Sequence, residues 1–588
     1  MNQAPPPLSF GPRPVGDGRT RFRLWAPAQE AVSLLVDDRL VLAMRPDGDG
    51  WFTVDAACGP GALYRFRLDD GLEVPDPASR FQPEDAFGPS MVVDHGAYRW
   101  RWSEWRGRPW SETVLYELHV GACGGFAGVE AMLPRLADLG VTAIELMPVN
   151  EFPGRRNWGY DGVLPYAPDA TYGTPDELKA LVDATHGHGL SILLDVVYNH
   201  FGPDGNFLGR YAPQFFRGDG TTAWGQALDF RQPPVRRFFA ENALYWLGEY
   251  RFDGLRFDAA QAIGDPTWLD ETAAMLRRSL PPGRQIHLVL EHDGNEALHL
   301  RRGYDAQWND DGHHALHTLL TGERHGYYSD YAEGAAARLA RCLAEGFVYQ
   351  GEASAYRGGR PRGTPSTDLP PTAFVLFLQN HDQIGNRAFG ERLTALADAA
   401  ALEAAIALQL LAPQIPLIFM GEEDASRTPF LYFTDHRPPL DAAVREGRRR
   451  EFAAFPAFAD PAGREFIPDP NAEATFLASI PAPDPHLGPG RHALYRELLA
   501  IRAREIVPRL DGTASLGAAA VGPAAVVARW RLGDGSRLTI AANLGPDLAR
   551  MAPPDGRLIH ATRGADPADV RGGRLVGRAA AAFLAAPG

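Results

Sequence analysis

Lysine is almost absent from this chain of 588 residues, because Lys179 is the only one among 58 lysine and arginine residues. It lies in the helical pattern DELKALVDATHGHGL, with no glycine-rich loop before it. A phosphate-binding P-loop is excluded, since that motif needs Gly-Lys followed by Ser or Thr. Schiff-base chemistry would also depend on this one residue, and no pyridoxal-phosphate context surrounds it. The chain therefore belongs to neither of these two large enzyme classes.

Cysteine is also scarce. The three cysteines, Cys58, Cys123 and Cys342, are far apart and odd in number, so they form neither a disulfide framework nor a C-x-x-C metal motif. This usage is typical of a reducing compartment. The first segment, MNQAPPPLSFGPRP, lacks the basic start and the apolar core of a signal peptide. We therefore expect a cytoplasmic protein.

The chain lacks an uninterrupted hydrophobic run and an excess of positive charge. The longest apolar stretch, residues 401–420, is broken by Glu403, Gln409, Gln414 and two prolines, which a bilayer core would penalise. The net charge of -15 and the pI near 5.6 argue against binding a nucleic acid, whose phosphates require a basic surface. We expect neither a membrane nor a nucleic acid as partner, and a neutral substrate.

The pattern of apolar segments changes twice along the chain. Residues 1–105 alternate short apolar strands with Gly, Asp and Pro turns, which is typical of a small β-sandwich. Residues 106–510 contain eight apolar strands separated by amphipathic helices and predict a (β/α)8 TIM barrel, with its longest insertion after the third strand, at residues 200–235. Residues 511–588 contain a hairpin pattern and predict a small all-β domain. The predicted fold is multidomain with a central barrel.

Three carboxylates follow predicted barrel strands at the end where barrel enzymes carry their catalytic groups. Asp258 ends strand four, Glu291 ends strand five and Asp382 ends strand seven. Glycosidic bond cleavage requires a pair of carboxylates, and the ends of neighbouring strands lie about 4.8 Å apart. This spacing suits the separation of about 5 to 5.5 Å found in retaining enzymes. The sequence therefore predicts a retaining glycoside hydrolase.

The charges around this pair predict which carboxyl group is ionised. Arg256 lies two residues before Asp258 and hence on the same face of the strand, where we expect its charge to hold Asp258 ionised. Asp382 is expected to keep Glu291 protonated, since like charges in one site raise a carboxyl pKa. The plainer interpretation is that charges at strand ends only neutralise each other. The convergence of several such strands on one mouth argues against it.

These segments resemble a known family. DVVYNH at 195–200, GLRFD at 254–258, Glu291 and NHD at 380–382 are similar to the four sequence regions of the alpha-amylase family of glycoside hydrolases. The resemblance runs from about residue 8 to the end of the chain. It includes an amino-terminal β-domain of the carbohydrate-binding type found in branching and debranching relatives.

Two further segments narrow the resemblance. Residues 303–328 and 421–436 look like the family members that act on maltooligosyl trehalose. The resemblance then implies hydrolysis of the α-1,4 bond next to the terminal trehalose, without a cofactor or a metal. It also implies a functional link to a maltooligosyltrehalose synthase.

The resemblance implies roles for individual residues. Asp258 would be the nucleophile, Glu291 the general acid/base and Asp382 the stabiliser of the transition state. The residues implied to contact the reacting sugar or to form its stacking wall are Arg256, His200, His381, Trp158 and Tyr160. Those implied to bind the rest of the substrate are Phe257, Ala259, Ala260, Gln261, Asn309, Asp310, Asp311, Gly312, His313, Gln383, Ile384, Gly385 and Asn386. Because Phe257 and the following Ala-Ala-Gln depart from the family pattern, we expect the sugar beyond the cleavage point to be held differently.

A metal site is the alternative interpretation of three histidines. His313, His314 and His317 have helical spacing, but neither Cys nor a carboxylate is patterned with them, so we expect an ordinary polar helix. Asn199 corresponds to a calcium ligand in many amylases. One Asn cannot supply the six to eight oxygens that calcium requires, and no calcium is expected.

The sequence leaves two other functions open. One is a different activity on the same scaffold, namely glycogen branching, debranching or amylase action. The segment NDDGHH, which begins at Asn309, argues against it. The other is an inactive α-glucan-binding protein, which the presence of all three carboxylates argues against. The fold alone cannot distinguish these functions from one another.

Overall fold

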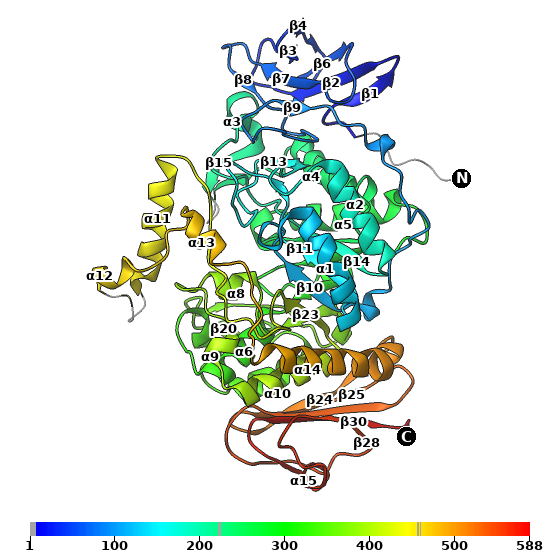
Figure 1. Cartoon of the computed structure of the whole chain (residues 1–588), viewed down its shortest axis with the longest axis vertical. Helices are drawn as coiled ribbons and strands as arrows, with labels where there is room; N and C mark the ends of the chain where they lie inside the picture. The colour runs from blue at the N-terminus through cyan, green and yellow to red at the C-terminus, as the bar shows by residue number, and fades with distance from the viewer. Residues whose placement is uncertain (1–7, 222–224, 455–457, 459, 588) are drawn as a thin grey trace.

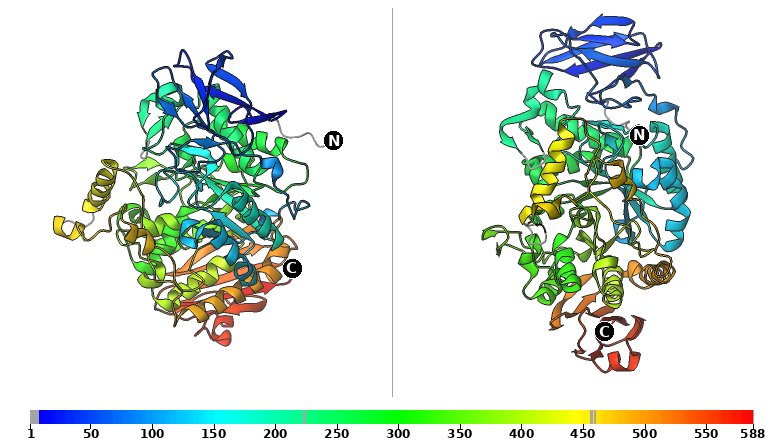
Figure 2. Two further views of the ribbon diagram at one scale, coloured as in Figure 1. Left: turned by 45° about the horizontal axis from the view of Figure 1, so that its top comes forward. Right: turned by 60° about the vertical axis from the view of Figure 1, so that its left-hand side comes forward.

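The computed structural model describes residues 8–221, 225–454, 458 and 460–587. The molecule is elongated, with two antiparallel sheets of the N-terminal segment at one end, a closed barrel in the middle and an antiparallel C-terminal sheet at the other end (Figure 1). Figure 2 shows the same order from two other directions. Within the described ranges, no helix is long and apolar enough to cross a membrane.

The N-terminal part consists of two sheets, with the strand orders β1-β2-β6-β5 and β4-β3-β7-β8, and β9 also pairs with β7. Alternate side chains of β2 and β7 point between the sheets, where the rings of Phe22 and Tyr64 lie 4.7 Å apart. The predicted β-sandwich is confirmed. Its strands are β1 (Arg13–Gly16), β2 (Arg19–Trp25), β3 (Ser33–Val36), β4 (Leu40–Ala43), β5 (Arg45–Pro46), β6 (Trp51–Ala56), β7 (Leu63–Arg67), β8 (Glu73–Val74) and β9 (Ser90–Met91).

Eight parallel strands close into a barrel in the order in which they occur along the chain. All eight coincide with the apolar segments that predicted them, because strands covered by helices on the outside and packed on the inside are apolar on both faces. The predicted TIM barrel is confirmed. The strands are β10 (Leu115–Leu118), β11 (Ala143–Leu146), β14 (Ser191–Val196), β17 (Gly254–Phe257), β18 (His287–Leu290), β19 (Ala306–Trp308), β22 (Phe374–Phe377) and β23 (Ile415–Phe419).

The helices around the barrel follow from their apolar periodicity. In α1, Val129, Leu133 and Leu136 recur every three or four residues and are fully buried on one face. Gly140 then adopts φ 102°, a left-handed conformation that glycine allows, and ends the helix with a bond to the carbonyl of Ala137. The main outer helices are α1 (Gly125–Leu139), α2 (Pro175–Gly187), α4 (Pro233–Gly248), α5 (Pro266–Ser279), α6 (Asp310–Thr321), α7 (Ala335–Glu345), α10 (Ala399–Leu411) and α14 (Gly488–Ile501).

The inside of the barrel changes from apolar to charged along the strands. An apolar cluster that includes Leu115 and Leu193 fills the lower part. Two residues further along, the same inward faces carry Glu117 on β10 and Asp195 on β14. Glu145 on β11 lies beside Glu117 and, on its other side, beside Leu193. The charged layer lies toward the carboxyl ends of the strands, where the predicted catalytic groups also lie.

The longest segment between a strand and its outer helix follows β23, and the prediction that it follows the third strand is wrong. Residues 420–487 separate β23 from α14, whereas residues 197–232 separate β14 from α4. The segment after β23 contains α11 (Leu440–Glu451), α12 (Pro461–Arg464) and α13 (Glu473–Leu477), and α11 projects from the body of the molecule (Figure 1). Its sequence, LDAAVREGRRRE, buries one residue and has no apolar periodicity that could have predicted it.

The C-terminal part is a five-stranded antiparallel sheet in the order β24-β25-β26-β30-β28. Helices α10 and α14 lie between the barrel and this sheet (Figure 1). Arg502, just after α14, is fully buried and donates to the carbonyls of Leu410, Ala412 and Gln414, which connects α14 to the end of α10. The strands are β24 (Ala514–Gly522), β25 (Ala525–Arg531), β26 (Arg537–Asn543), β28 (Arg557–Ala561) and β30 (Ala579–Ala585).

Candidate active site

Arg256, on β17, connects three carboxylates at the mouth of the barrel. Its Nη1 atom donates to Asp195 Oδ2 at 2.6 Å and to Asp258 Oδ1 at 3.0 Å, and its Nη2 atom donates to Glu291 Oε2 at 2.8 Å. The guanidinium is fully buried and lies 4.2 Å from the centre of the Trp308 ring. Because the planar guanidinium fixes the directions of its donors, Arg256 sets the relative positions of Asp258 and Glu291.

The turn after β17 supplies a second donor to Glu291. Ala259 has φ 38°, in the left-handed region, and its backbone N–H donates to Glu291 Oε2 at 2.8 Å. A non-glycine residue in this region costs about 1 to 3 kcal/mol, so the surrounding contacts must hold it. Asp258 in turn accepts a bond from Nδ2 of Asn199 at 2.7 Å. Both carboxylates are therefore fixed by donors from the barrel and its loops.

A second hydrogen-bonded chain runs from Asp195 to Glu117. The hydroxyl of Tyr160 donates to Asp195 Oδ2 at 2.7 Å and lies 2.8 Å from Nε2 of His381, whose Nδ1 pairs with Glu117. Burial lowers the pKa of His381, but the carboxylates of Glu117 and Asp382 raise it more, to about 9. His381 is therefore an imidazolium at neutral pH and donates from both nitrogens.

Burial raises the pKa of both central carboxyl groups. It raises the pKa of Asp258 to about 6 although the charge of Arg256 lowers this pKa, because desolvation is the larger effect. Burial together with the charges of Asp258 and Asp382 raises the pKa of Glu291 to about 7, against the lowering by Arg256. Between these values Asp258 is ionised while Glu291 keeps its proton.

A hollow of about 220 Å³ opens beside Glu291 and Asp382. Three residues predicted to bind substrate, Asp310, Gln383 and Asn386, line it. Burial and the charge of Glu291 raise the pKa of Asp310 to about 8, so this carboxyl is protonated at neutral pH and can donate a hydrogen bond. The hollow thus offers both hydrogen-bond donors and hydrogen-bond acceptors next to Glu291 and Asp382.

Sequence reasoning missed most of the other side chains that line the hollow. They are Asp293, Trp308, His314, Tyr327, Asp330, Tyr331, Tyr356, Arg357 and Arg362. Apart from Trp308, which ends a barrel strand, they lie in loops, in α6 and in the 3-10 helix Gly326–Tyr331, where the sequence has no spacing that relates them to the carboxylates. Two signals could have identified some of them: Trp308 ends a strand, and Trp308, His314 and Tyr327 lie in the segment 303–328 that carries the family resemblance.

Five residues predicted to bind substrate are buried among other protein atoms. Asp311 accepts from Arg362 at 2.9 Å and from the backbone N–H of Val348 at 2.6 Å. A Cβ added to Gly312 would lie 2.6 Å from a carbon of Leu376. The contacts of Asp311 hold α6 to its neighbouring loop, and direct sugar contact by these residues stays a prediction. The five are Phe257, Asn309, Asp311, Gly312 and His313.

The predicted stacking wall consists of two layers. Trp158 is 4% exposed and its ring stacks on Phe430 at 5.3 Å, so it forms the inner layer. Tyr160 is more exposed and its ring stacks on His381 at 5.2 Å. Gly385 is required for this packing, since a Cβ at that position would lie 2.0 Å from the ring of Trp158.

The remaining predicted residues surround the mouth without lining the hollow. His200 is 4% exposed and follows β14. Ala260 and Gln261 lie in the short turn after β17, where Gln261 Oε1 accepts from the N–H of Asp293 at 3.3 Å. Ile384 is buried in the helical turn that begins at His381.

The three histidines of α6 are packed side chains. Nδ1 of His313 lies 2.6 Å from the carbonyl of Leu378, and Nε2 of His317 pairs with Glu323 at 2.8 Å. The ring of His317 stacks on Tyr328 at 4.2 Å. Among the described residues, no group of three or more His, Cys, Asp or Glu side chains could hold a metal ion.

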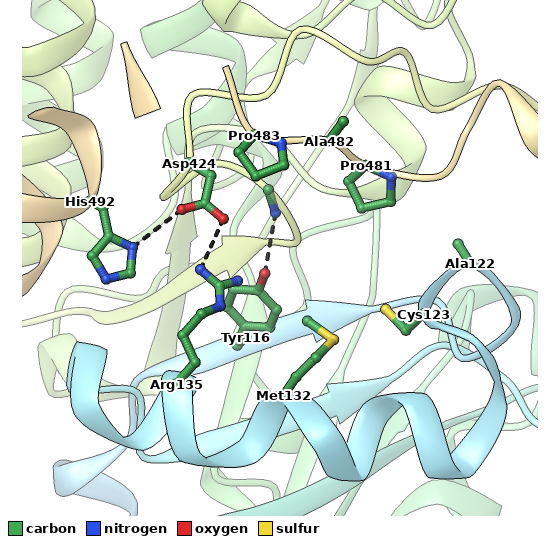
Figure 3. A pocket seen from close by; sticks show the side chains of 11 residues that line it. Tyr116, Ala122, Cys123, Met132, Arg135, Asp424, Pro481, Ala482, Pro483 and His492 are labelled. Carbon is green, nitrogen blue, oxygen red and sulfur yellow. Dashed lines mark hydrogen bonds and ion pairs between the residues drawn. The ribbon is translucent and has the colours of Figure 1, made fainter. Parts of the chain in front are cut away.

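A second cavity, of about 510 Å³, opens on the flank of the barrel beside α1 (Figure 3). There Asp424 contacts Arg135 at 2.9 Å and His492 at 3.2 Å, while Met132 and Cys123 point toward the cavity. This cavity shares no lining residue with the hollow at the mouth. The carboxylate pair therefore locates the candidate active site at the mouth of the barrel.

The fold and this site define the class of protein. Residues 78–212 match the family described as alpha amylase, catalytic domain, and residues 513–582 match a domain of unknown function. The TIM barrel carries two carboxyl groups at the ends of adjacent strands, and one arginine binds both. Because their pKa values differ, one is ionised while the other keeps its proton, as glycosidic bond cleavage requires. The chain is a glycoside hydrolase of the alpha-amylase family.

Its relatives are more specific and extend over most of the chain. The chain is 43% identical over 511 residues to malto-oligosyltrehalose trehalohydrolase of Deinococcus radiodurans, covering 85% of this chain and 83% of the relative. It is 41% identical over 461 residues to the same enzyme of Saccharolobus solfataricus, covering 76% and 80%. A crystal structure of a putative alpha amylase from Salmonella typhimurium superposes with a TM-score of 0.92 at 44% identity, covering 98% of this chain and 100% of that one. The chain belongs to the malto-oligosyltrehalose trehalohydrolase family.

Proposed function

We propose that the protein hydrolyses the α-1,4-glucosidic bond next to the terminal trehalose unit of a maltooligosyl trehalose and releases trehalose with retention of configuration. The observation that carries this proposal is that Arg256 holds Asp258 and Glu291 together at the ends of adjacent strands, in a chain of this family. Adjacent strands favour the short carboxylate separation of retaining enzymes, about 5 to 5.5 Å.

The pKa order supports a division of roles between the two carboxyl groups. Asp258, with the lower pKa, is the nucleophile that attacks the anomeric carbon. Glu291, with a pKa raised to about 7, protonates the oxygen of the leaving trehalose. The covalent glycosyl-enzyme is then opened by a water molecule that Glu291, now ionised, activates as a base. Asp382 stabilises the positive charge that develops on the sugar in the transition state.

The surroundings of the carboxylates suggest where the two parts of the substrate lie. The partly exposed ring of Tyr160 and the imidazolium of His381 face the sugar that becomes attached to Asp258. The hollow beside Glu291 receives the leaving trehalose, because the general acid must contact the leaving oxygen. Asp310, Gln383 and Asn386 then bind hydroxyl groups of the trehalose.

The proposed substrate implies a partner enzyme, and the composition of the chain supports a location in the cell. Maltooligosyl trehalose has to be made from an α-glucan by an enzyme that converts the reducing end to trehalose, and we infer that such a synthase works together with this protein. The scarcity of cysteine supports a cytoplasmic location. Fractionation of the source cells followed by an assay for trehalose release tests this location, and activity confined to the culture medium contradicts it.

The decisive experiment compares two substrates. Purified protein is incubated with maltotriosyl trehalose or with maltopentaose, and released trehalose and new reducing ends are measured by chromatography. We expect trehalose from the first substrate and little cleavage of the second. Faster cleavage of maltopentaose, or formation of branched products, would contradict the proposal and favour an amylase or a branching enzyme.

A variant without the nucleophile is the matched control. Asp258→Asn keeps the shape of the side chain and should lower turnover by about 10⁴-fold or more, since the covalent step is lost. The exposed pair of Asp555 with Arg537 offers the comparison variant Asp555→Asn, which should retain full turnover. Tight binding of maltooligosaccharides by the unmodified protein with no turnover would identify it as an inactive α-glucan-binding protein.

A further inference from the structure

Glu145, on β11, is a buried carboxyl group whose oxygens have no hydrogen-bond partner among the described residues. It is 1% exposed, and strand alternation places it on the same inward face as Ala143, which belongs to the apolar cluster of the lower barrel. A buried polar group left unsatisfied costs about 1 to 3 kcal/mol. Its retention inside the barrel, directly below the catalytic mouth, therefore points to a role.

Other polar atoms in the barrel interior are unsatisfied in the same way. Oδ1 of Asp195, Nε of Arg256 and Nε1 of Trp308 are buried without a partner in the described part of the chain. With the two oxygens of Glu145 they make five such atoms, contributed by four strands of one barrel. Buried polar atoms without protein partners are normally satisfied by ordered water, because one water molecule can satisfy two to four polar atoms.

The charged side chains around Glu145 already pair with one another, which makes Glu145 the neutral carboxyl group among them. The strand register places Glu117 directly beside Glu145, and Glu117 pairs with the imidazolium of His381. Asp195 pairs with Arg256 at 2.6 Å. The groups that face Glu145 are thus two carboxylates and two cations that already have partners. Burial and the charges of Glu117 and Asp195 raise the pKa of Glu145 well above its ordinary value.

We propose that Glu145 is a positioning residue, whose neutral carboxyl group donates a hydrogen bond through buried water toward the second oxygen of Asp195. A protonated carboxyl has one O–H donor, which an ionised carboxylate lacks. Oδ2 of Asp195 already accepts bonds from Arg256 and Tyr160, so only Oδ1 remains to be satisfied. The bond holds Asp195 in place and, through it, the guanidinium that spaces the two catalytic carboxylates.

This inference rests on the proposed roles of Asp258 and Glu291, and its test separates the two. Three variants are compared with the unmodified protein: Glu145→Gln, Glu145→Met and Gln409→Met. Gln409 is the control, because it is a buried polar side chain like Glu145. It donates to the carbonyls of Leu376 and Leu417 and lies on the outer helix α10. The kcat, KM and pH profile of each are measured on the substrate that the unmodified protein cleaves fastest.

The expected results follow from the proposal that the carboxyl group of Glu145 is neutral. Glu145→Gln replaces one neutral donor by another and should keep kcat within about threefold and leave the pH profile unchanged. Glu145→Met removes the donor and should lower kcat by about tenfold or more with little change in KM, because small displacements of catalytic groups are costly. Gln409→Met should lower thermal stability without this loss of kcat. A pH limb that moves in Glu145→Gln, or an unchanged kcat in Glu145→Met, overturns the proposal.

An infrared measurement tests the protonation without any substrate. The difference spectrum between the unmodified protein and Glu145→Gln at pH 7 should contain the C=O band of one buried protonated carboxyl group. A carboxylate band in its place shows that Glu145 is ionised and overturns the proposal, even if Glu145→Met does not fold. Since no turnover is involved, this readout remains valid if the proposed substrate is wrong.

Discussion

The Nη2 atom of Arg256 lies 2.8 Å from Oε2 of Glu291, while the other terminal nitrogen of the same guanidinium lies 3.0 Å from Asp258. One rigid group therefore binds both the residue with the lower pKa and the residue with the higher pKa. The spacing of the pair depends on the shape of the arginine and not only on its charge.

Replacing this arginine by lysine should separate shape from charge. In Arg256→Lys the positive charge remains, but one ammonium on a flexible chain cannot bind both carboxylates in a fixed geometry. We expect kcat for trehalose release to fall by about 100-fold or more. Arg537→Lys, in the exposed pair with Asp555, is the control and should be fully active. A kcat near the unmodified value in Arg256→Lys would show that charge alone suffices.

The pH dependence of kcat/KM should be a narrow bell. Activity rises as Asp258 loses its proton, with a pKa of about 6, and falls as Glu291 loses its proton, with a pKa of about 7. The limbs belong to the interacting pair as a whole. In Asp382→Asn a negative charge that raises the pKa of Glu291 is lost, so the alkaline limb of the residual activity should move to lower pH. Movement to higher pH would contradict the assigned electrostatics.

Gly385 should be intolerant of any side chain. In Gly385→Ala the added Cβ would lie 2.0 Å from the ring of Trp158, so the ring or the helical turn that begins at His381 must shift. We expect at least a tenfold loss of kcat/KM, of the order seen when catalytic groups are displaced. Gly490→Ala, in α14 and with no atom within 4 Å of its added Cβ, should be nearly neutral. Equal activity of the two variants would mean that Trp158 is not part of the support of the site.

Asp311 should contribute to stability more than to binding. Its carboxylate is fully buried and pairs with Arg362 at 2.9 Å, so Asp311→Ala leaves a buried cation without its partner. We expect a loss of about 3 to 5 kcal/mol in the free energy of unfolding of the barrel, measured by urea denaturation. Asp310→Ala, which alters a partly exposed neighbour, should cost much less. A similar cost for both would show that the buried pair has no special role.

The fold was largely predictable because its signals are local. Most barrel strands lie in short, mainly apolar segments, as in the segment FDGLRFD that ends at Asp258, and such segments can be recognised without knowledge of their partners. The segment after β23 was not predictable. Its helix α11 is held mainly by ion pairs and by the bonds of Arg448 to the carbonyls of Gly385 and Arg387, which leave no apolar periodicity.

The candidate site was predictable where strand ends determine it. Asp258, Glu291 and Asp382 stand at consecutive or nearby strand ends, so the barrel geometry alone brings them together. The side chains of the hollow, such as Tyr356 and Arg357, were not predictable, because only the folded loops place them beside Glu291. The structure also gives buried neighbours of the hollow, Asp311 and His313 among them, a supporting position that motif resemblance cannot distinguish from contact.

The most direct test of the central claim is to follow the first turnovers on maltotriosyl trehalose by proton NMR. If Asp258 forms a covalent intermediate and Glu291 protonates a leaving trehalose, the first products are trehalose and the α-anomer of maltotriose, which then mutarotates. Early appearance of the β-anomer, or release of glucose or maltose in place of trehalose, would contradict the account.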